Sequence, residues 1–257
     1  MFGLDPAVFW FVLAVTFFAG FVKGAIGFAM PMIMMSALAS VMPPRQALAA
    51  LILPVLVTNI MQAGRDGPGP AWDAVRRYRW HIGMVALFII LSAPLVTIMP
   101  QGLLYLTLGL PITLYALWQL SGRPLRLDLR HERRFEIVSG MIGGFYGGIA
   151  GIWGPPLIVY LLSVGASKQD QMRVQGVVFL LGAVALTGAH LVSGVLNDAT
   201  LPLSALLILP AVAGMLAGGW VHDRLDVAQF RRWTLVLLVL SGLNLVRRGL
   251  EIAAAGG

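Results

Sequence analysis

The sequence predicts an all-α protein that crosses a lipid bilayer many times, and three observations carry this prediction. Of the 257 residues, 58% are hydrophobic and only 11% are charged, and the mean hydropathy is +0.85, whereas a soluble domain carries about a quarter charged residues. Apolar runs recur along the whole chain, and most arginines gather in the few polar loops between them. This composition excludes an ordinary soluble enzyme and a disordered chain. We attribute the net charge of +7 to basic loops beside a membrane, not to nucleic-acid binding.

The apolar runs are the predicted membrane segments, and a full crossing needs about 20 residues. They lie at 7–22, 25–42, 46–63, 80–99, 101–121, 136–150, 154–166, 172–194, 201–219 and 230–248. The first two runs, and likewise the runs at 136–150 and 154–166, are short for a crossing, and each pair is joined by a glycine-rich stretch. The first run lacks a preceding basic region and a cleavage pattern, so we interpret it as a retained segment, not a signal peptide.

The basic loops predict the orientation of the chain. Three loops, at 64–79, 122–135 and 220–232, hold most of the arginines, and the turns near residues 100 and 198 hold none. By the positive-inside rule the three loops are cytoplasmic and both termini are periplasmic. The loop residues concerned are Arg65, Arg76, Arg77, Arg79, Arg123, Arg126, Arg130, Arg133, Arg134, Arg224, Arg231 and Arg232. The residues that depart from the rule are Arg45, Arg247 and Arg248.

This orientation divides the chain into two halves that cross the membrane in opposite senses. We predict a first repeat at 1–121, a cytoplasmic basic linker at 122–135 and a second repeat at 136–257, each repeat with one broken-helix pair and three further transmembrane helices. The pattern G-x-x-x-G-x-x-G occurs in both repeats, with an offset of 127 residues. Its glycines are Gly20, Gly24 and Gly27 in the first repeat, and Gly147, Gly151 and Gly154 in the second.

Both glycine stretches are predicted to interrupt a helix. Because proline fits the first turn of a helix, one helix should end near Gly151 and another begin near Pro155, after Trp153 and Gly154. Irregular backbone survives in a membrane only against protein or a water-filled cavity. If the two pairs are hairpins that enter from opposite faces, their helix N-termini meet near the midplane and form an anion site.

Two alternatives stay open at this point. The glycines can serve only the close packing of helices, which is the interpretation we favour for Gly143, Gly144, Gly147 and Gly148. The short pairs can also be full crossings, which would give ten spans and leave the orientation of the loops unchanged.

Lys23 is the one charged residue deep in an apolar run. A charge inside the membrane costs at least about 2.5–3.5 kcal/mol, so it is a functional candidate, and the alternative is a side chain that snorkels to the interface. No Asp or Glu lies well inside a run, which disfavours a carboxylate proton relay or a cation site. Asn59 and Thr187, 128 residues apart, are further candidates for the cavity, with interhelical hydrogen bonding as the alternative.

The segments GFVKGAIGFAMP and GGFYGGIAGIWGPPLIVYLL, the length and the central basic loop resemble the TauE/SafE family of sulfite and organosulfonate exporters across nearly the whole chain. The resemblance implies a bacterial inner-membrane permease for small sulfur-containing or carboxylate anions, with two related halves and no tightly bound cofactor. It also implies which residues form the site. They are Gly20, Lys23, Gly24 and Gly27 from the first motif, and Gly151, Trp153, Gly154 and Pro155 from the second.

The expected function is therefore secondary transport, as an exporter, of sulfite or an organosulfonate by alternating access, with a small anion and the lipid bilayer as partners. A carrier or channel for carboxylates or thiosulfate is the alternative. An intramembrane enzyme is less favoured, because the chain lacks G-x-S-x-G, H-E-x-x-H and any cluster of histidines and carboxylates in the spans. We expect no metal site, and association into a homodimer is left open.

Overall fold

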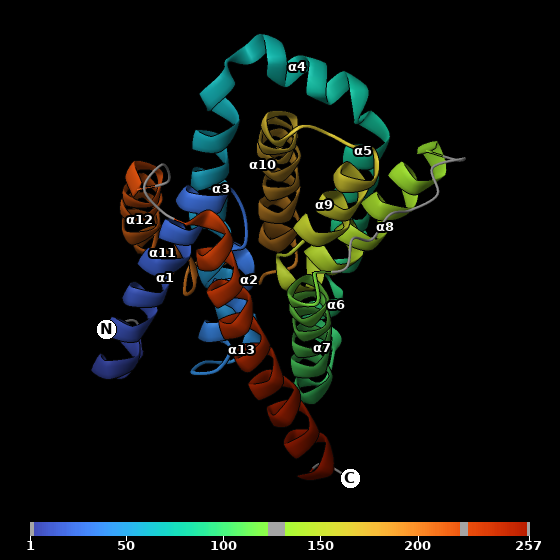
Figure 1. Ribbon diagram of the computed structural model, residues 1–257. Coiled ribbons are helices and arrows are strands. Elements are labelled where there is room, and N and C mark those ends of the chain that lie inside the picture. The colour runs from blue at the N-terminus through green and yellow to red at the C-terminus, as the bar shows by residue number, and fades with distance from the viewer. Residues whose placement is uncertain (1–2, 123–131, 222–225, 256–257) are drawn as a thin grey trace.

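The computed structural model describes residues 3–122, 132–221 and 226–255, and these are helical with no strand (Figure 1). The elements in order are α1 (Pro6–Ile26), α2 (Met30–Leu38), α3 (Pro44–Ala63), the 3-10 turn η1 (Gly64–Asp66), α4 (Pro68–Arg77), α5 (Arg79–Ser92), α6 (Leu95–Ile98), α7 (Gln101–Leu120), α8 (Glu132–Ala150), α9 (Gly154–Ser163), α10 (Lys168–Val192), α11 (Leu201–Leu206), α12 (Ile208–Val221) and α13 (Val227–Ala255).

The prediction of an all-α multi-pass membrane protein is confirmed. Six segments of the described chain are long and apolar enough to cross a bilayer, and each has 20 to 23 residues. They are Pro6–Ile26, Pro44–Ala63, Arg79–Ile98, Gln101–Leu120, Asp170–Val192 and Leu201–Val221. Their outward surfaces carry exposed leucine, isoleucine, phenylalanine and tryptophan side chains, as a surface that faces lipid requires.

The expectation that both members of each broken pair are short is wrong for the first member. Helix α1 has 21 residues and α8 has 19, whereas α2 has 9 and α9 has 10. Helix α1 continues four residues beyond the predicted end of its apolar run, through Lys23, and ends before Gly27. A second difference concerns the 64–79 loop, which contains the helix α4.

Both predicted helix breaks are present, and glycine provides the backbone conformation at each. Helix α1 ends at Gly27 with φ +84°, and α8 ends at Gly151 with φ +70°. A left-handed residue is a common end to a helix and costs glycine little. Helices α2 and α9 then begin with Pro31 and Pro155 in their first turns, where the missing N–H of proline leaves no bond unmade.

The register predicted between the two glycine motifs is wrong by three residues. Around the two breaks, corresponding positions lie 124 residues apart, as shown by the helix ends at 27 and 151, the starts of α2 and α9 at 30 and 154, and the starts of α3 and α10 at 44 and 168. This register pairs Gly24 with Gly148, not with Gly151. In this register Thr187 is no longer the counterpart of Asn59, because the two residues lie 128 positions apart.

Equivalent helices of the two halves pack reciprocally. Helix α1 of the first half packs on α12 of the second half, and α8 of the second half packs on α5 of the first. Helices α5 and α12 belong to the predicted runs 80–99 and 201–219, which are the fourth run in each half. Helices α3 and α10 contact each other, and so do α7 and α13 (Figure 1). Two related halves would produce this exchange. The inverted orientation and the boundaries 1–121, 122–135 and 136–257 stay predictions.

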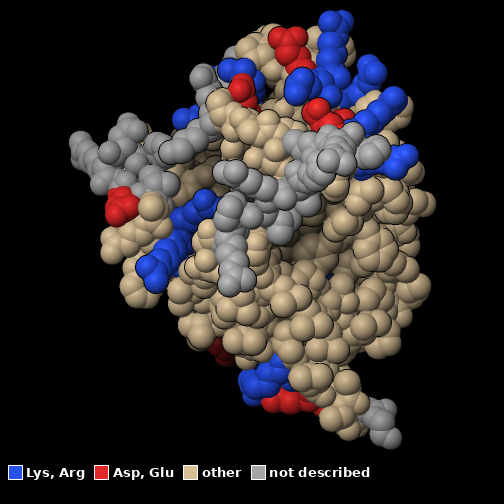
Figure 2. Space-filling view, turned by 45° about the vertical axis from the view of Figure 1, so that its right-hand side comes forward, with Lys and Arg blue, Asp and Glu red and all other residues tan. Residues whose placement is uncertain are grey.

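Basic side chains concentrate at the end of the molecule that carries α4, above a broad uncharged belt (Figure 2). Arg76 lies over the ring of Trp72 at 5.5 Å, and Arg133 lies over Trp80 at 4.5 Å. Aromatic and basic residues together are typical of a membrane interface. The predicted loop residues Arg123, Arg126, Arg130 and Arg224 lie outside the described residues. Which end faces the cytoplasm stays a prediction.

Gly20 and Gly24 allow α1 to approach α12 closely. A Cβ added at Gly24 would overlap the carbonyl oxygen of Met215, and one added at Gly20 would overlap that of Ala211. We expect Gly24→Ala to lower the free energy of unfolding by about 1–3 kcal/mol, as overpacking does. Gly219→Ala is the matched control, because its Cβ meets nothing within 4 Å. Thermal unfolding in detergent measures both, and equal melting temperatures would contradict the packing role.

Candidate functional site

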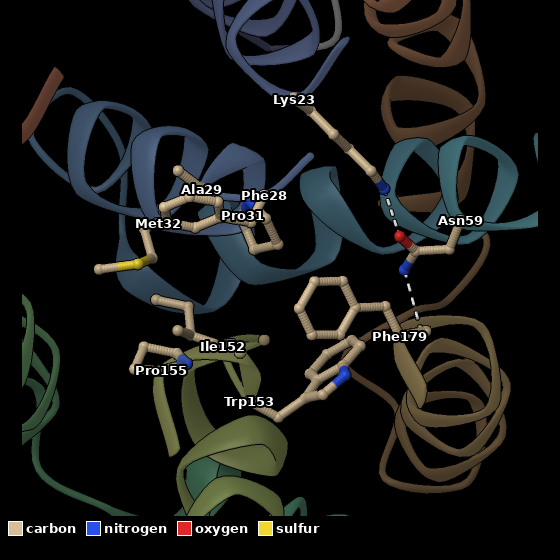
Figure 3. Close-up of a pocket in the computed structure, with 12 residues that line it drawn as sticks. Lys23, Phe28, Ala29, Pro31, Met32, Asn59, Ile152, Trp153, Pro155 and Phe179 are labelled. Carbon is tan, nitrogen blue, oxygen red and sulfur yellow. Dashed lines mark hydrogen bonds between the residues drawn. The ribbon is translucent and has the colours of Figure 1, made fainter. Parts of the chain in front are cut away.

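A small cavity lies where the two chain breaks approach α3 and α10. Its volume is about 30 Å³, which holds one or two water molecules. Larger ligands therefore require the surrounding helix ends to move apart. The residues that line the cavity are Lys23, Phe28, Ala29, Pro31, Met32, Asn59, Gly151, Ile152, Trp153, Gly154, Pro155 and Phe179 (Figure 3).

Lys23 is the charged group of this cavity, and it turns inward to α3. Lys23 is 2% exposed, and its ammonium group donates a hydrogen bond to Thr58 Oγ1 at 3.0 Å. It donates a second one to Asn59 Oδ1 (Figure 3). Asn59 Nδ2 in turn donates to the carbonyl oxygen of Phe179 at 3.0 Å. This chain of bonds connects α1, α3 and α10 through the wall of the cavity.

The positive charge of Lys23 has no acidic partner among the described residues, whose ion pairs lie elsewhere. Thr58 and Asn59 offer neutral oxygens, which satisfy hydrogen bonds but do not neutralise charge. Because a buried charge is expensive without an opposite one, the arrangement favours a small anion beside the ammonium group.

The N-terminal ends of α2 and α9 contribute to the same cavity. Neither helix has a side-chain cap, and Pro31 and Pro155 in their first turns line the cavity. The positive end of a helix dipole favours negative charge. Ala29, the residue before α2, has φ +75°, which costs an alanine about 1–2 kcal/mol. Strained backbone of this kind clusters at functional sites.

Trp153 provides an unused hydrogen-bond donor at the cavity wall. The side chain is 2% exposed, and its Nε1 has no hydrogen-bond partner in the part of the chain that the structure describes. Its ring packs edge-on against Phe179, with centroids 6.3 Å apart. A Cβ added at Gly182 would lie 2.7 Å from Nε1, so the ring fits only beside a glycine. An unpaired buried N–H is costly, and this one faces α10 at Gly182.

The structure brings most of the predicted site residues together. Those that line the cavity are Lys23, Asn59, Gly151, Trp153, Gly154 and Pro155. Gly27 adjoins it, and its carbonyl oxygen accepts a hydrogen bond from Gln62 Nε2 at 3.1 Å.

Gly20, Gly24 and Thr187 are not brought to the cavity. The two glycines face α12 and are occupied by helix packing. The hydroxyl of Thr187 donates to the carbonyl oxygen of Ala183 at 2.8 Å, within its own helix. The sequence reasoning missed Thr58 and Phe179, although the polar Thr58 directly precedes Asn59 in an apolar run and was a visible signal.

Asn59 and Thr187 therefore provide a matched pair of variants. We expect Asn59→Ala to weaken anion binding about tenfold or more, because it frees Lys23 from a charge-assisted hydrogen bond and unlinks α3 from α10. Thr187→Ala should bind as the parent does, because its hydroxyl serves only its own helix. Binding is measured by the rise in melting temperature with added sulfite. Equal effects of the two variants would contradict this assignment.

One carboxylate lies deeper than the sequence suggested. Glu136, placed at the end of a run, is 7% exposed, and its Oε1 accepts the backbone N–H of His81 at 3.2 Å. It lies near the start of α8 and does not line the cavity. His190 is hydrogen-bonded inside the protein, with Nε2 at 2.9 Å from the carbonyl oxygen of Gly148. The described residues include no group of three or more histidines and carboxylates that could hold a metal ion.

The fold defines a multi-pass membrane protein. The family model described as "Sulfite exporter TauE/SafE" matches residues 12–245, and the chain belongs to this family. Searches of curated proteins and of solved structures find no match.

Proposed function

We propose that the protein is a secondary transporter that exports small sulfur-containing oxyanions, such as sulfite or an organosulfonate, by alternating access at the cavity between the two chain breaks. The observation that carries this proposal is Lys23, a buried cation whose partners are neutral oxygens. In this function Lys23 supplies the counter-charge and the first turns of α2 and α9 supply the positive ends of their dipoles.

The arrangement of helices supports a moving site. The cavity lies between two short helices, α2 and α9, each joined to a long helix by a three-residue connection that begins with a left-handed glycine. Its volume of about 30 Å³ is too small for an oxyanion, which needs more room than a water molecule, so the helix ends around it would have to move apart. Rocking of one half or bundle against the other would open the cavity to each side in turn.

Export needs no coupling ion under this proposal. With the inside negative, each monovalent anion that leaves gains about 2.3 kcal/mol per 100 mV. The buried Glu136 lies near the start of α8 and does not line the cavity, and carboxylates are absent from the lining. Transport should therefore follow the membrane potential and the anion gradient alone.

The experiment is flux in proteoliposomes with the potential clamped, using sulfite, methanesulfonate, thiosulfate and acetate, with nickel as the cation control. We expect saturable sulfite or methanesulfonate flux that reverses with the sign of the potential and needs no proton or sodium gradient. Flux that does not saturate would indicate a channel. Flux of acetate or thiosulfate alone would favour another small anion as the cargo, and nickel flux alone would overturn the proposal.

A further inference from the structure

A second, much larger cavity lies beside the Lys23 site. It is formed by α7 and α8, with contributions from α2, α5 and the start of α9, and its volume is about 540 Å³. Its lining is almost entirely apolar and includes Phe88, Thr107, Ile112, Met141 and Phe145. We name it the α7–α8 cleft.

The α7–α8 cleft shares a wall with the cavity that contains Lys23. Met32, Ile152 and Pro155 line both spaces. In the close-up these three side chains lie on the side of the small cavity away from Lys23 (Figure 3). Met32 is the adaptable part of this wall, because an unbranched thioether changes its conformation at low cost. A ligand bound at Lys23 therefore needs to pass only these side chains to reach the cleft.

The far side of the cleft faces the membrane. Ile142 is 57% exposed and Phe145 is 47% exposed, both on α8. The hydroxyl of Tyr146 donates to the carbonyl oxygen of Leu108 at 3.0 Å and ties α8 to α7 across the cleft. Because the exposed side chains of Ile142 and Phe145 border the cleft, an amphiphile dissolved in the bilayer has a lateral route toward the site.

A second apolar cleft provides an internal comparison. This corresponding cleft of about 320 Å³ lies between α1, α2 and α13, and its lining includes Ala14, Ile33 and Thr234. It has no lining residue in common with the Lys23 cavity. The contact with the anion site is therefore a property of the α7–α8 cleft and does not follow from the helix arrangement that both clefts share.

We propose that the α7–α8 cleft holds the apolar tail of an amphiphilic organic anion whose charged group binds at Lys23. This inference rests on the proposed function and deepens it, because it assigns the site to anions that carry a hydrocarbon tail. The charged group takes the small polar space, and the tail crosses the Met32–Ile152 wall into the apolar one. The neighbouring charge selects this occupant over a lipid acyl chain, which has no anionic group at its buried end to place beside Lys23.

The test is inhibition of sulfite uptake in proteoliposomes by methanesulfonate, butanesulfonate and hexanesulfonate. For the parent we expect the inhibition constant to fall about fourfold for each added methylene, the value for a methylene removed from water. Thr107→Phe and Met141→Phe each place a ring in the cleft and should flatten this dependence. Ala14→Phe fills the other cleft and should keep it. Each variant is normalised to its own methanesulfonate constant, and variants are compared at the same tail length, so that partition of the tails into lipid is equal on both sides of the comparison.

The possible results separate this inference from the function on which it rests. A dependence on tail length that is absent, or equal in all variants, overturns the inference, and Lys23-dependent inhibition by methanesulfonate would then leave the proposed function intact. A third result would assign the cleft to a lipid and overturn the inference as well. In that case phospholipid co-purifies with the parent but not with Thr107→Phe, and inhibition does not depend on tail length. If methanesulfonate and its longer relatives all fail to inhibit, sulfonates are not ligands and the inference falls with them.

Discussion

Replacing Lys23 with methionine is expected to abolish saturable anion transport while the protein stays inserted and folded. Methionine keeps the unbranched shape of the side chain, one atom shorter, and removes its charge. Truncating one partner of a buried charge pair costs about 2–5 kcal/mol, so the apparent affinity for sulfite should fall by at least thirtyfold. The melting temperature without ligand should be equal to or above that of the parent, because the variant no longer buries a cation without a counter-charge.

Two measurements separate the loss of the site from the loss of the fold. Sulfite should raise the melting temperature of the parent, since a ligand at 100 times its Kd stabilises by about 2.7 kcal/mol, and it should leave Lys23→Met unchanged. Arg247→Met is the control for removal of a cation, because Arg247 pairs with Glu251 at 2.8 Å near the C-terminal end of α13. Parent-like uptake by Lys23→Met would remove Lys23 from the site.

The helix breaks could be predicted from the sequence because their chemistry is local. A left-handed helix end needs glycine, and a new first turn accepts proline, so Gly151 and Pro155 placed the second break within a residue or two. The extent of α1 could not be predicted in this way. The glycines at 20, 24 and 27 could each have ended the helix, and only the last of them does.

The register of the two halves was ambiguous for a geometric reason. The second half contains glycines at 144, 147, 148, 151 and 154, so a shift of three residues still places glycine opposite glycine. Three residues are close to one helical turn, and the shift therefore preserves the faces of the helices as well. The structure resolves the ambiguity because in each half one short helix follows a long helix that ends at a left-handed glycine. These short helices, α2 and α9, begin at single defined positions.

The contacts of Lys23 were beyond sequence reasoning. Thr58 and Asn59 lie 35 and 36 residues away, and no local pattern reports a contact at that separation. Charge alone identified Lys23, because burial of an ionised group in a membrane is costly whatever surrounds it. Thr187 was selected by an apparent equivalence to Asn59, and it left the site once the register changed.

Gly154→Leu is expected to block transport without unfolding the protein. A Cβ at Gly154 would lie 3.1 Å from Cζ of Phe179, and the rest of a leucine side chain would have to enter a cavity of about 30 Å³. Because Gly154 begins α9, the added side chain would also cover the positive end of that helix dipole and keep the anion from it. Uptake of sulfite in proteoliposomes should fall to the level of empty vesicles.

The control for a bulky residue in a membrane helix is Gly188→Leu, on α10, where an added Cβ meets nothing within 4 Å. Gly154→Ala gives the intermediate case, because the Phe179 ring has to give way by only a few tenths of an ångström. The uptake rates should therefore decrease in the order parent, alanine, leucine, with Gly188→Leu equal to the parent. If Gly154→Leu transports at the parent rate, Gly154 is a packing residue, and the anion approaches Lys23 by another side of the cavity.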